Sequence, residues 1–428
     1  MTTEKLYPRY LEERLAESLT DSPIVLVHGP RQCGKTTFTR VFGEPNGYSY
    51  LSFDDEVVRG AARTDPTDFV SKLPRHVILD EVQRVPAIFL PLKLVVDRDR
   101  VPGRFILTGS SNVLLLPRLA DSLAGRMQIL RLHPLAQCEL GRRKSSFLRT
   151  LFSGAFTTRT MQRLGDDVQS RVTGGGYPAA LARPHGSRRT AWYRDYLEAL
   201  MQRDVRDLAR ISSLDVLPRL LALCAAQTSR LFNVSELSSP FQLSRPTIRD
   251  YLTLLERTFL IDTVPSWHTN RLSRLIKTPK LHLGDTGTAA ALLGVGSSAL
   301  AEDRALFGQL LESFVFQELK RLASWEAYPI AFFHLRDKDG VEVDIVLEGQ
   351  AGRLAGVEVK AAATVTGSDF RGLRKLRASA GKRFAAGIVL YDGETCAPFG
   401  DGLFAVPIRL LWEAPEAGAH GDEHESPS

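Results

Sequence analysis

The residues with the clearest chemistry lie in one stretch near the start of the chain. Two glycines enclose four residues, and a lysine and two threonines follow directly, which is the G-x-x-x-x-G-K-[ST] spacing of a phosphate-binding loop. Such glycines let backbone N–H groups turn toward a polyphosphate, and the lysine then reaches its outer phosphates. The stretch predicts binding of a nucleoside triphosphate, and a chance match in a strand–turn–helix is the alternative. The predicted nucleotide-binding residues are Gly29, Pro30, Arg31, Gln32, Cys33, Gly34, Lys35, Thr36 and Thr37.

Two acidic residues end a short apolar run at 76–80 and supply the chemistry that the loop lacks. We expect Thr36 and Asp80 to hold Mg²⁺, the latter through water, and Glu81 to act as the general base. The alternative is an acidic pair that caps a helix. Ser110 or Asn112, at the end of a later apolar run, is expected to sense the γ-phosphate, although small polar residues are common at strand ends.

These residues require a parallel sheet to bring them together. Apolar runs at 24–28, 48–53, 76–80, 104–111 and 127–132 are separated by helical stretches, which predicts a three-layer α/β nucleotide-binding domain. Ligands bind such sheets at the carboxyl ends of the strands. The loop, the acidic pair and the polar run all follow strands, so we expect them at one edge.

The segments GPRQCGKTT, VILDEVQ, LTGSSN and SLAGR, in this order, resemble AAA+ ATPases. More closely, they resemble a bacterial group that joins an AAA+ module to a C-terminal domain of unknown function with a nuclease-like fold. The resemblance runs from about Arg9 to about Leu410. It implies that Arg126 of SLAGR is an arginine finger for a neighbouring subunit, and hence a homo-oligomer of the hexamer-type ring; a surface arginine is the alternative. It also implies a helical lid whose Tyr177 or Pro178 packs near the adenine, unless this segment is a plain turn.

Residues 232–264 have the pattern of a winged helix-turn-helix. Ser244 is suited to cap a second helix, which would present Arg245, Thr247 and Arg249 to the major groove of DNA. The alternative is a packing module without nucleic acid, since many ATPases use this fold only as a lid.

A new α/β pattern begins near Thr278. A helix at 306–322 carries Glu312, and strands at 341–347 and 356–360 carry Asp344, Glu358 and Lys360. This set resembles the PD-(D/E)-x-K nuclease core. The resemblance implies that Asp344 and Glu358 bind Mg²⁺, that Lys360 positions a water and that Glu312 is an outer acid. A domain that kept the fold without the activity is the alternative.

Composition and charge bound the remaining possibilities. The chain has 428 residues, a net charge of +6 and a pI near 9.1, a balance compatible with nucleic acid as a partner. No apolar run is long enough to span a membrane. Four cysteines without C-x-x-C spacing argue against a zinc site and fit a reducing cytoplasm.

The sequence thus predicts an α/β protein with an ATPase core (1–135), a helical lid (136–215), a winged helix (216–277), a restriction-endonuclease-like domain (278–412) and a disordered tail (413–428). The leading hypothesis is a cytoplasmic, ring-forming ATPase that remodels DNA. One alternative is a nucleotide-controlled switch or scaffold that acts on a protein partner, with a silent C-terminal domain. A third is an ATP-gated, metal-dependent DNA nuclease.

Overall fold

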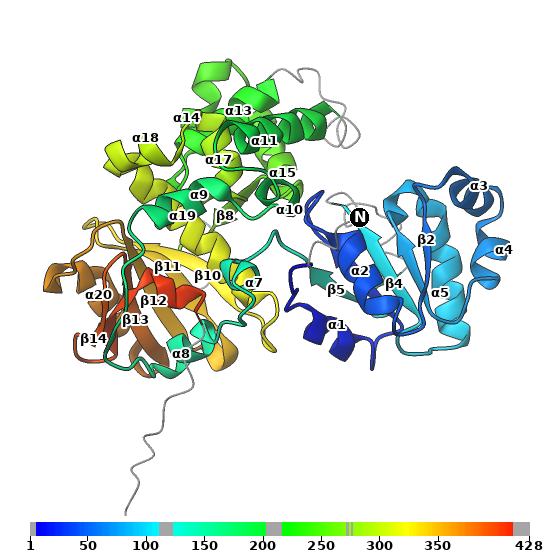
Figure 1. The fold of residues 1–428 in the computed structure, drawn as a ribbon, viewed down its shortest axis with the longest axis horizontal. Coiled ribbons are helices and arrows are strands. Elements are labelled where there is room, and N and C mark those ends of the chain that lie inside the picture. Colours follow the sequence, from blue (N-terminus) through cyan, green and yellow to red (C-terminus); the bar gives the residue numbers. More distant parts are fainter. Residues whose placement is uncertain (1–5, 111–122, 203–215, 271–273, 275–276, 414–428) are drawn as a thin grey trace, which may run out of the picture.

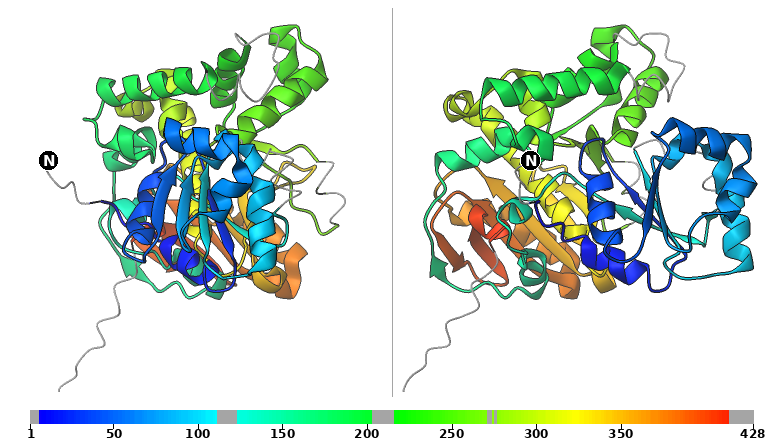
Figure 2. Two further views of the ribbon diagram at one scale, coloured as in Figure 1. Left: turned by 90° about the vertical axis from the view of Figure 1, so that its right-hand side faces the viewer. Right: turned by 45° about the vertical axis from the view of Figure 1, so that its right-hand side comes forward.

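The structure is a computed structural model that describes residues 6–110, 123–202, 216–270, 274 and 277–413. Figure 1 shows an N-terminal α/β domain on the right, a second sheet domain at the lower left and a helical unit above. The two further views in Figure 2 also place the helical unit over both α/β domains. Among the described helices, none is both long and apolar enough to cross a membrane.

A five-stranded parallel sheet forms the N-terminal domain, in the order β2-β3-β4-β1-β5. The predicted parallel α/β core is therefore confirmed. Its strands are β1 (Ile24–His28), β2 (Ser49–Ser52), β3 (Val77–Asp80), β4 (Phe105–Gly109) and β5 (Met127–Arg131). Its helices are α1 (Glu12–Ser18), α2 (Lys35–Gly43), α3 (Glu56–Thr64), α4 (Pro66–Ser71) and α5 (Phe89–Arg98). The runs of β1, β3 and β4 are apolar because these central strands are buried on both faces.

A helical unit follows, built around α17 (Thr286–Leu293), which packs against four other helices. Its further helices are α9 (Asp166–Gly174), α10 (Pro178–Leu181), α11 (Ser187–Leu200), α13 (Val216–Ala226) and α18 (Ser297–Glu302). The hydroxyl of Tyr193 on α11 donates to the carbonyl of Gly174 (2.9 Å), which helps hold α9 against α11.

Beside these helices lies a small antiparallel sheet of β7 (Arg230–Leu231), β9 (Lys280–Leu283) and β8 (Ile261–Val264). The helices α14 (Val234–Ser238) and α15 (Arg245–Arg257) precede β8. As expected, the Ser244 side chain caps α15 by accepting a hydrogen bond from the Thr247 N–H. The domain border expected at residue 278 is wrong, because β9 pairs with β7 and β8 and so completes this sheet.

The C-terminal domain is a seven-stranded sheet in the order β10-β11-β12-β13-β15-β14-β6. The strands are β10 (Ala331–Arg336), β11 (Glu342–Glu348), β12 (Leu354–Lys360), β13 (Phe384–Tyr391), β14 (Thr395–Pro398), β15 (Leu403–Pro407) and β6 (Arg159–Thr160). The helices α8 (Phe147–Ser153) and α19 (Arg304–Ala323) cover one face and α20 (Arg371–Ala380) the other. Because α8 and β6 belong to this sheet domain, the lid expected over 136–215 is too long.

The helix α19 connects all three parts through a buried polar junction. Arg321 donates to the carbonyl of Leu135 (2.9 Å) and forms ion pairs with Glu318 (2.6 Å) and Asp285 (3.1 Å). Glu318 in turn accepts from the backbone N–H of Gln137 (2.8 Å), at the start of the short helix α7 (Gln137–Leu140). The chain that leaves the N-terminal sheet is therefore held directly on the helix that supports the C-terminal sheet.

Candidate ATP site and C-terminal carboxylate cluster

The phosphate-binding loop leaves the carboxyl end of β1 and enters α2 at Lys35. A Cβ atom on Gly29 would lie 2.1 Å from the carbonyl oxygen of Leu132, so a larger residue cannot fit there. Gly34 has a φ of 98°, a left-handed conformation that favours glycine. These two positions explain why the motif needs glycine at each end of the loop.

Lys35 is buried, and its ammonium donates to the backbone carbonyls of Gly29 (3.0 Å) and Pro30 (2.9 Å). Both partners belong to the loop itself and are neutral. These carbonyls hold the positive charge at the loop. A phosphate oxygen is anionic and therefore a stronger acceptor, so it can replace them.

Asp80, at the end of β3, is the centre of a hydrogen-bonded group of oxygens. Its carboxylate accepts from the hydroxyls of Thr36 (3.1 and 3.2 Å), Tyr50 (2.8 Å) and Thr108. Thr36 and Asp80, the expected magnesium residues, thus lie together beside the loop, and their hard oxygen atoms suit Mg²⁺. Sequence reasoning missed Tyr50, which lies on β2, the strand that pairs with β3. Burial and the contact with Asp80 raise the pKa of Tyr50 to about 12, so it remains a donor.

Glu81, the expected base, has a left-handed backbone with a φ of 59°. Holding a non-glycine residue there costs about 1 kcal/mol or more, and such strain is common at functional sites. Its N–H donates to the Thr108 hydroxyl (3.2 Å), while the Gln83 amide donates to its carboxylate and to the Ser110 hydroxyl (3.0 Å). Gln83 was missed, although it stands in the VILDEVQ segment. Asn112 lies outside the described residues.

A cavity of about 700 Å³ opens between the loop and the helical unit. Glu81 and the loop form one wall, and α10 and α11 form the other. The lining residues from the helices are Pro178, Ala179, Trp192, Asp195, Tyr196, Ala199 and Leu200. The volume and the mixed aromatic and polar lining are those of a small-molecule site.

Of the two residues expected near a base, Pro178 lines this cavity and Tyr177 does not. The Tyr177 side chain is buried behind Trp192 and Tyr196, with ring centroids 5.8 and 5.0 Å away. The Tyr196 hydroxyl lies 3.2 Å from that of Tyr177 and 3.3 Å from the carbonyl of Arg31 in the loop. The aromatic residues spaced along α11 were the available signal for this wall.

Arg126 lies at the opposite edge of the sheet from the phosphate loop. It directly precedes β5, whose first residue pairs with Ile24, whereas the loop follows His28. The guanidinium forms a two-point ion pair with Asp97 on α5, at 2.5 and 3.1 Å. Arg126 therefore does not reach the nucleotide site of its own chain.

The carboxyl edge of β1 and β5 contacts the small three-stranded sheet. Arg131 lies 3.9 Å from Asp262 on β8, and its guanidinium covers the ring of Phe259 at 4.5 Å. The neighbouring His28 also faces Phe259. Burial, followed by the charges of Arg131 and Lys35, lowers the pKa of His28 to about 3, so this histidine is neutral at pH 7.

The C-terminal acids also come together, but around a lysine. Lys280 of β9 is buried, and its ammonium lies 2.7 Å from Glu312 on α19 and 3.2 Å from Asp344 on β11. Glu358 joins the same cluster, and one of its carboxylate oxygens is buried with no hydrogen-bond partner among the described residues. Sequence reasoning missed Lys280, because it was assigned to the entry of the next domain.

The cluster carries less negative charge than three ionised carboxylates would. Burial and the charge of Asp344 raise the pKa of Glu312 to about 8 and that of Glu358 well above its usual range. Burial by itself would lower the pKa of Lys280, but Glu312 and Asp344 outweigh it and raise that pKa. At neutral pH the lysine is therefore charged.

The residues at this cluster do not fit the expected metal site. Lys280 lies between Glu312 and Asp344, and Lys360 lies 3.4 Å from Asp369, a residue outside the expected set. Within the described ranges, no group of three or more His, Cys, Asp or Glu side chains is arranged to hold a metal ion. We therefore correct the expected assignment of Glu312, Asp344, Glu358 and Lys360 to a magnesium site.

The residues expected to contact DNA divide into two kinds. Arg245 and Arg249 are exposed and line a groove of about 580 Å³, together with Lys277 and polar residues of α14 and β8. Thr247 instead lies 2.8 Å from the Ser244 hydroxyl and belongs to the helix cap.

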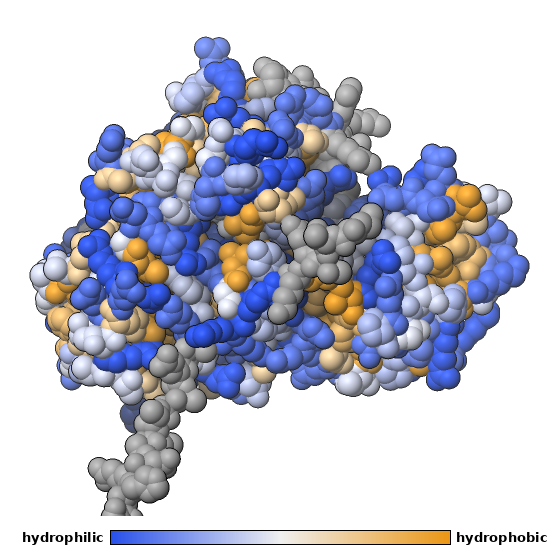
Figure 3. Space-filling view, viewed as in Figure 1, coloured by the Kyte–Doolittle hydropathy of each residue, from blue (hydrophilic) through white to orange (hydrophobic). Residues whose placement is uncertain are grey.

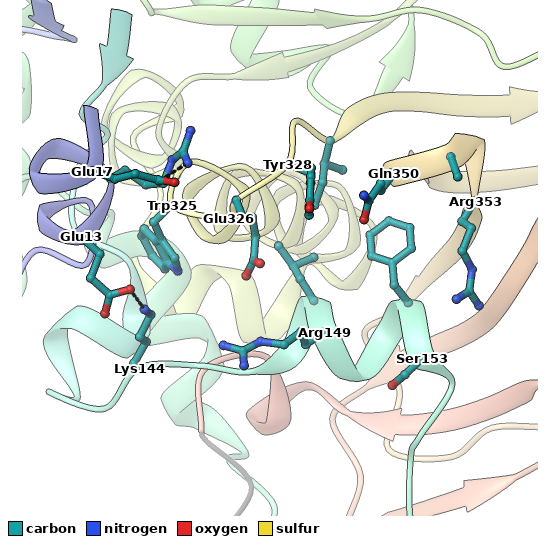
Figure 4. A pocket seen from close by; sticks show the side chains of 17 residues that line it. Glu13, Glu17, Lys144, Arg149, Ser153, Trp325, Glu326, Tyr328, Gln350 and Arg353 are labelled. Atoms are coloured by element: carbon teal, nitrogen blue, oxygen red, sulfur yellow. Dashed lines mark hydrogen bonds and ion pairs between the residues drawn. The ribbon is translucent and has the colours of Figure 1, made fainter. Parts of the chain in front are cut away.

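A second hollow of about 650 Å³ lies where α1 meets the C-terminal domain, shown in Figure 4. Its charged side chains come from several elements, and Lys144 pairs with Glu13 of α1 at 2.5 Å. This pair crosses from the N-terminal domain to the segment before α8. We assign the hollow to the packing of the two domains.

Comparison with known families identifies three regions of the chain. Residues 21–141 match the family described as "AAA domain". Residues 165–299 and 307–411 match two families described as domains of unknown function, DUF8612 and DUF4143. The first region covers the five-stranded sheet, the second covers the helical unit with the small sheet, and the third covers most of the C-terminal sheet domain.

The chain is also similar to individual proteins. Uncharacterized proteins of Mycobacterium bovis and Mycobacterium tuberculosis are each 28% identical over 400 residues, which cover 93% of this chain and 83% of each relative. Among solved structures, a Walker-type ATPase of Pyrococcus abyssi is 16% identical, with a TM-score of 0.44 over 68% of this chain and 97% of the other. The Thermotoga maritima RuvB Holliday junction branch migration motor is 17% identical, with a TM-score of 0.28 over 60% and 89%. By the family matches, residues 21–141 are similar to AAA-type P-loop ATPase domains, and the same chain carries a C-terminal region that matches DUF4143.

Proposed function

We propose that the protein hydrolyses ATP and couples hydrolysis to the binding and remodelling of DNA. The observation that carries the ATPase activity is the convergence of Lys35, Thr36, Asp80 and Glu81 beside one cavity of about 700 Å³. Lys35 exchanges loop carbonyls for phosphate oxygens, and Glu81 orients and polarises the attacking water. Thr36 and Asp80 would hold Mg²⁺, which would neutralise charge on the phosphates. Trp192 and Tyr196 supply the wall for the base.

The groove beside α15 supports DNA as the partner. Arg245 and Arg249 lie one helical turn apart and share the groove with Lys277, so three cations face one surface. We assign α13, α14, α15 and the small sheet to a winged-helix fold, because two short helices followed by a strand pair are its order of elements. Such a surface binds phosphates mainly by charge, with an affinity that falls steeply as salt rises.

The contact between β5 and β8 supports coupling of the two activities. Arg131 and His28 stand at the end of the strands that border the phosphate loop, and both contact Phe259. Phe259 and Asp262 belong to the segment that follows the groove helix. A movement of the loop on nucleotide binding therefore has a direct path to the groove through packed side chains.

The test measures DNA binding by fluorescence anisotropy between 50 and 300 mM salt, roughly the range in which charge contacts weaken. We expect Arg245→Ala with Arg249→Ala to lower the affinity and to reduce the salt slope by about two. Arg188→Ala, an exposed arginine outside the groove, is the control. Absence of binding at low salt, or an ATPase rate that no DNA stimulates, would contradict the DNA proposal.

We further propose that the active form is a ring in which Arg126 serves the adjacent subunit. Apolar side chains of α3 and α5 are exposed, namely Val57 (81%), Leu90 (56%) and Leu94 (45%), and Figure 3 shows apolar surface over this end of the domain. Asp97 on α5 holds Arg126 in the single chain. Sedimentation with a non-hydrolysable ATP analogue should show a larger assembly, and Arg126→Ala should lower turnover without lowering nucleotide binding.

A second function, a nucleotide-controlled switch that acts on a protein partner, is favoured by one observation. Lys280 already compensates the C-terminal acids, as expected if the C-terminal domain is catalytically silent. The order of β10 to β13, with a helix on each face, supports a nuclease-like fold that has become a binding module. This function predicts DNA-independent hydrolysis and an assembly state that follows the nucleotide. The ATP-gated nuclease has no such support.

A further inference from the structure

The cluster around Lys280 brings together residues from two different sheets. Glu312 and Asp344 belong to the C-terminal domain, whereas Lys280 lies on β9 of the small sheet. The lysine is 5% exposed, and the two carboxylates keep 13% and 9% of their side-chain surface. An ammonium buried this deeply needs acidic partners, and here it faces two carboxyl groups.

Three of the oxygens that a metal would need are already engaged, whereas one oxygen of Glu358 has no hydrogen-bond partner among the described residues. One oxygen of Asp344 faces Lys280, and the other accepts from the backbone N–H of Val359 at 2.9 Å. An oxygen of Glu312 also faces Lys280. A divalent cation prefers about six oxygen ligands in open geometry, and here it would have to remove Asp344 from both of its donors. It would also lie next to an ammonium of like charge.

The same lysine also links the small sheet to the C-terminal domain. Next to it, the N–H of His334 on β10 donates to the carbonyl of Pro265 (3.0 Å), so the segment after β8 pairs with the edge of the C-terminal sheet. The Nδ1 atom of His282, two residues beyond Lys280, forms a hydrogen bond with the hydroxyl of Ser313 on α19 (3.0 Å). The ion pair is thus one of several contacts that attach the small sheet to α19 and β10.

We propose that Lys280 is the resident cation of the C-terminal carboxylate cluster. It occupies the position that a divalent metal would need, so the domain works without a metal and not as a metal-dependent nuclease. Replacing the ammonium with an uncharged side chain opens a divalent-cation site on Asp344, Glu312 and Glu358. This inference concerns a site separate from the phosphate loop, and it stands or falls independently of the proposed ATPase activity.

The experiment measures the number of Mn²⁺ ions bound by the full-length, nucleotide-free protein, by electron paramagnetic resonance of the free ion. Lys280→Met should bind one Mn²⁺ more per chain than the wild type. Adding Asp344→Asn to this variant should remove the extra ion, and Lys280→Arg should match the wild type. Lys320→Met is the matched control, because Lys320 is also buried and paired with a carboxylate, that of Asp262, outside the cluster. It should gain no site.

If Lys280→Met does not fold, single substitutions in the otherwise native chain test the proposal instead. Asp344→Asn and Glu358→Gln, each made alone, should leave the number and affinity of bound Mn²⁺ unchanged. A Mn²⁺ site that either substitution removes from the otherwise native chain overturns the proposal. A folded Lys280→Met that gains no ion overturns it as well. Loss of ATP hydrolysis in a separate phosphate-loop variant would change none of these outcomes.

Discussion

Two buried lysines that lie near acidic residues, Lys35 and Lys280, differ in what they touch. Lys35 donates to the neutral carbonyls of Gly29 and Pro30, while Asp80 accepts from hydroxyls nearby. Lys280 donates to the carboxylates of Glu312 and Asp344. A lysine held by carbonyls keeps its charge directed toward an incoming anion, whereas a lysine held by carboxylates is already compensated. Similar residue types therefore serve a ligand in one region and the fold in the other.

The largest expected effect separates the two lysines by turnover. Lys35→Met should lower kcat for ATP hydrolysis by about 10³-fold, since a charge that stabilises the transferring phosphoryl group is lost. Lys280→Met, assayed at a temperature where it is folded, should change kcat by about twofold at most, because no phosphate contacts it. Steady-state phosphate release measures both. Equal losses in the two variants would mean that the C-terminal cluster takes part in the hydrolysis cycle.

A smaller effect separates the acids of the two regions. Glu81→Gln should lower kcat by at least about 10²-fold, the lower range for removing a general base. Its binding of ATP should persist, because the loop and Lys35 are intact, and the nucleotide should remain bound during gel filtration. Glu302→Gln, an exposed carboxylate on α18, is the control. Unchanged turnover in Glu81→Gln would remove this residue from the role of base.

The third effect concerns stability. Lys280→Met should lower the free energy of unfolding by about 3–5 kcal/mol, because Glu312 and Asp344 lose their counter-charge inside the protein. Urea unfolding followed by far-UV circular dichroism measures it. Lys375→Met, which breaks a surface pair with Asp337 and Asp339, should cost about 1 kcal/mol or less. A loss as small as this in Lys280→Met would show that the buried pair does not stabilise the fold.

The smallest effect is a difference in pH dependence at the two regions. His28 has a pKa of about 3 in the folded chain and 6.5 normally, so its contribution to the free energy of unfolding is complete above about pH 6.5. It is lost as the pH falls toward 3, at about 1.4 kcal/mol per pH unit. Glu312 changes the stability in the opposite direction. Its pKa is about 8 in the folded chain, so its contribution to the free energy of unfolding is complete below about pH 4.5 and is lost as the pH rises through 8.

Unfolding free energies measured across pH test this contrast. His28→Gln should flatten the acid side of the profile, and Glu312→Gln should flatten the side between pH 5 and pH 8, roughly the span between the two pKa values. The wild type provides the reference curve. An acid side that keeps its full slope in His28→Gln would mean that this histidine is already protonated in the folded protein.

The local sequence predicted the parallel sheet and the phosphate loop well. The strand runs ended within two residues of the observed strands, because continuous apolar stretches are buried on both faces wherever they occur. The glycines and Lys35 could be assigned for a similar reason: the loop is a local structure whose geometry depends on adjacent residues. Asp80 and Thr36 then met because the carboxyl ends of all the parallel strands lie at one edge of the sheet, although β4 separates β3 from β1.

Contacts between distant segments could not be read in this way. The sequence indicated Glu312, Asp344 and Glu358 as acids on suitable elements, but only the pairing of β9 with β7 and β8 brings Lys280 among them. Tyr177 and Trp192 were likewise interchangeable by residue type, and the packing of α11 on the turn before α10 decided which one faces the cavity. The sequence by itself determined where the phosphate-binding loop lies. The tertiary structure decided that the second acidic cluster already contains its cation, since a lysine far away in the chain completes the charge balance.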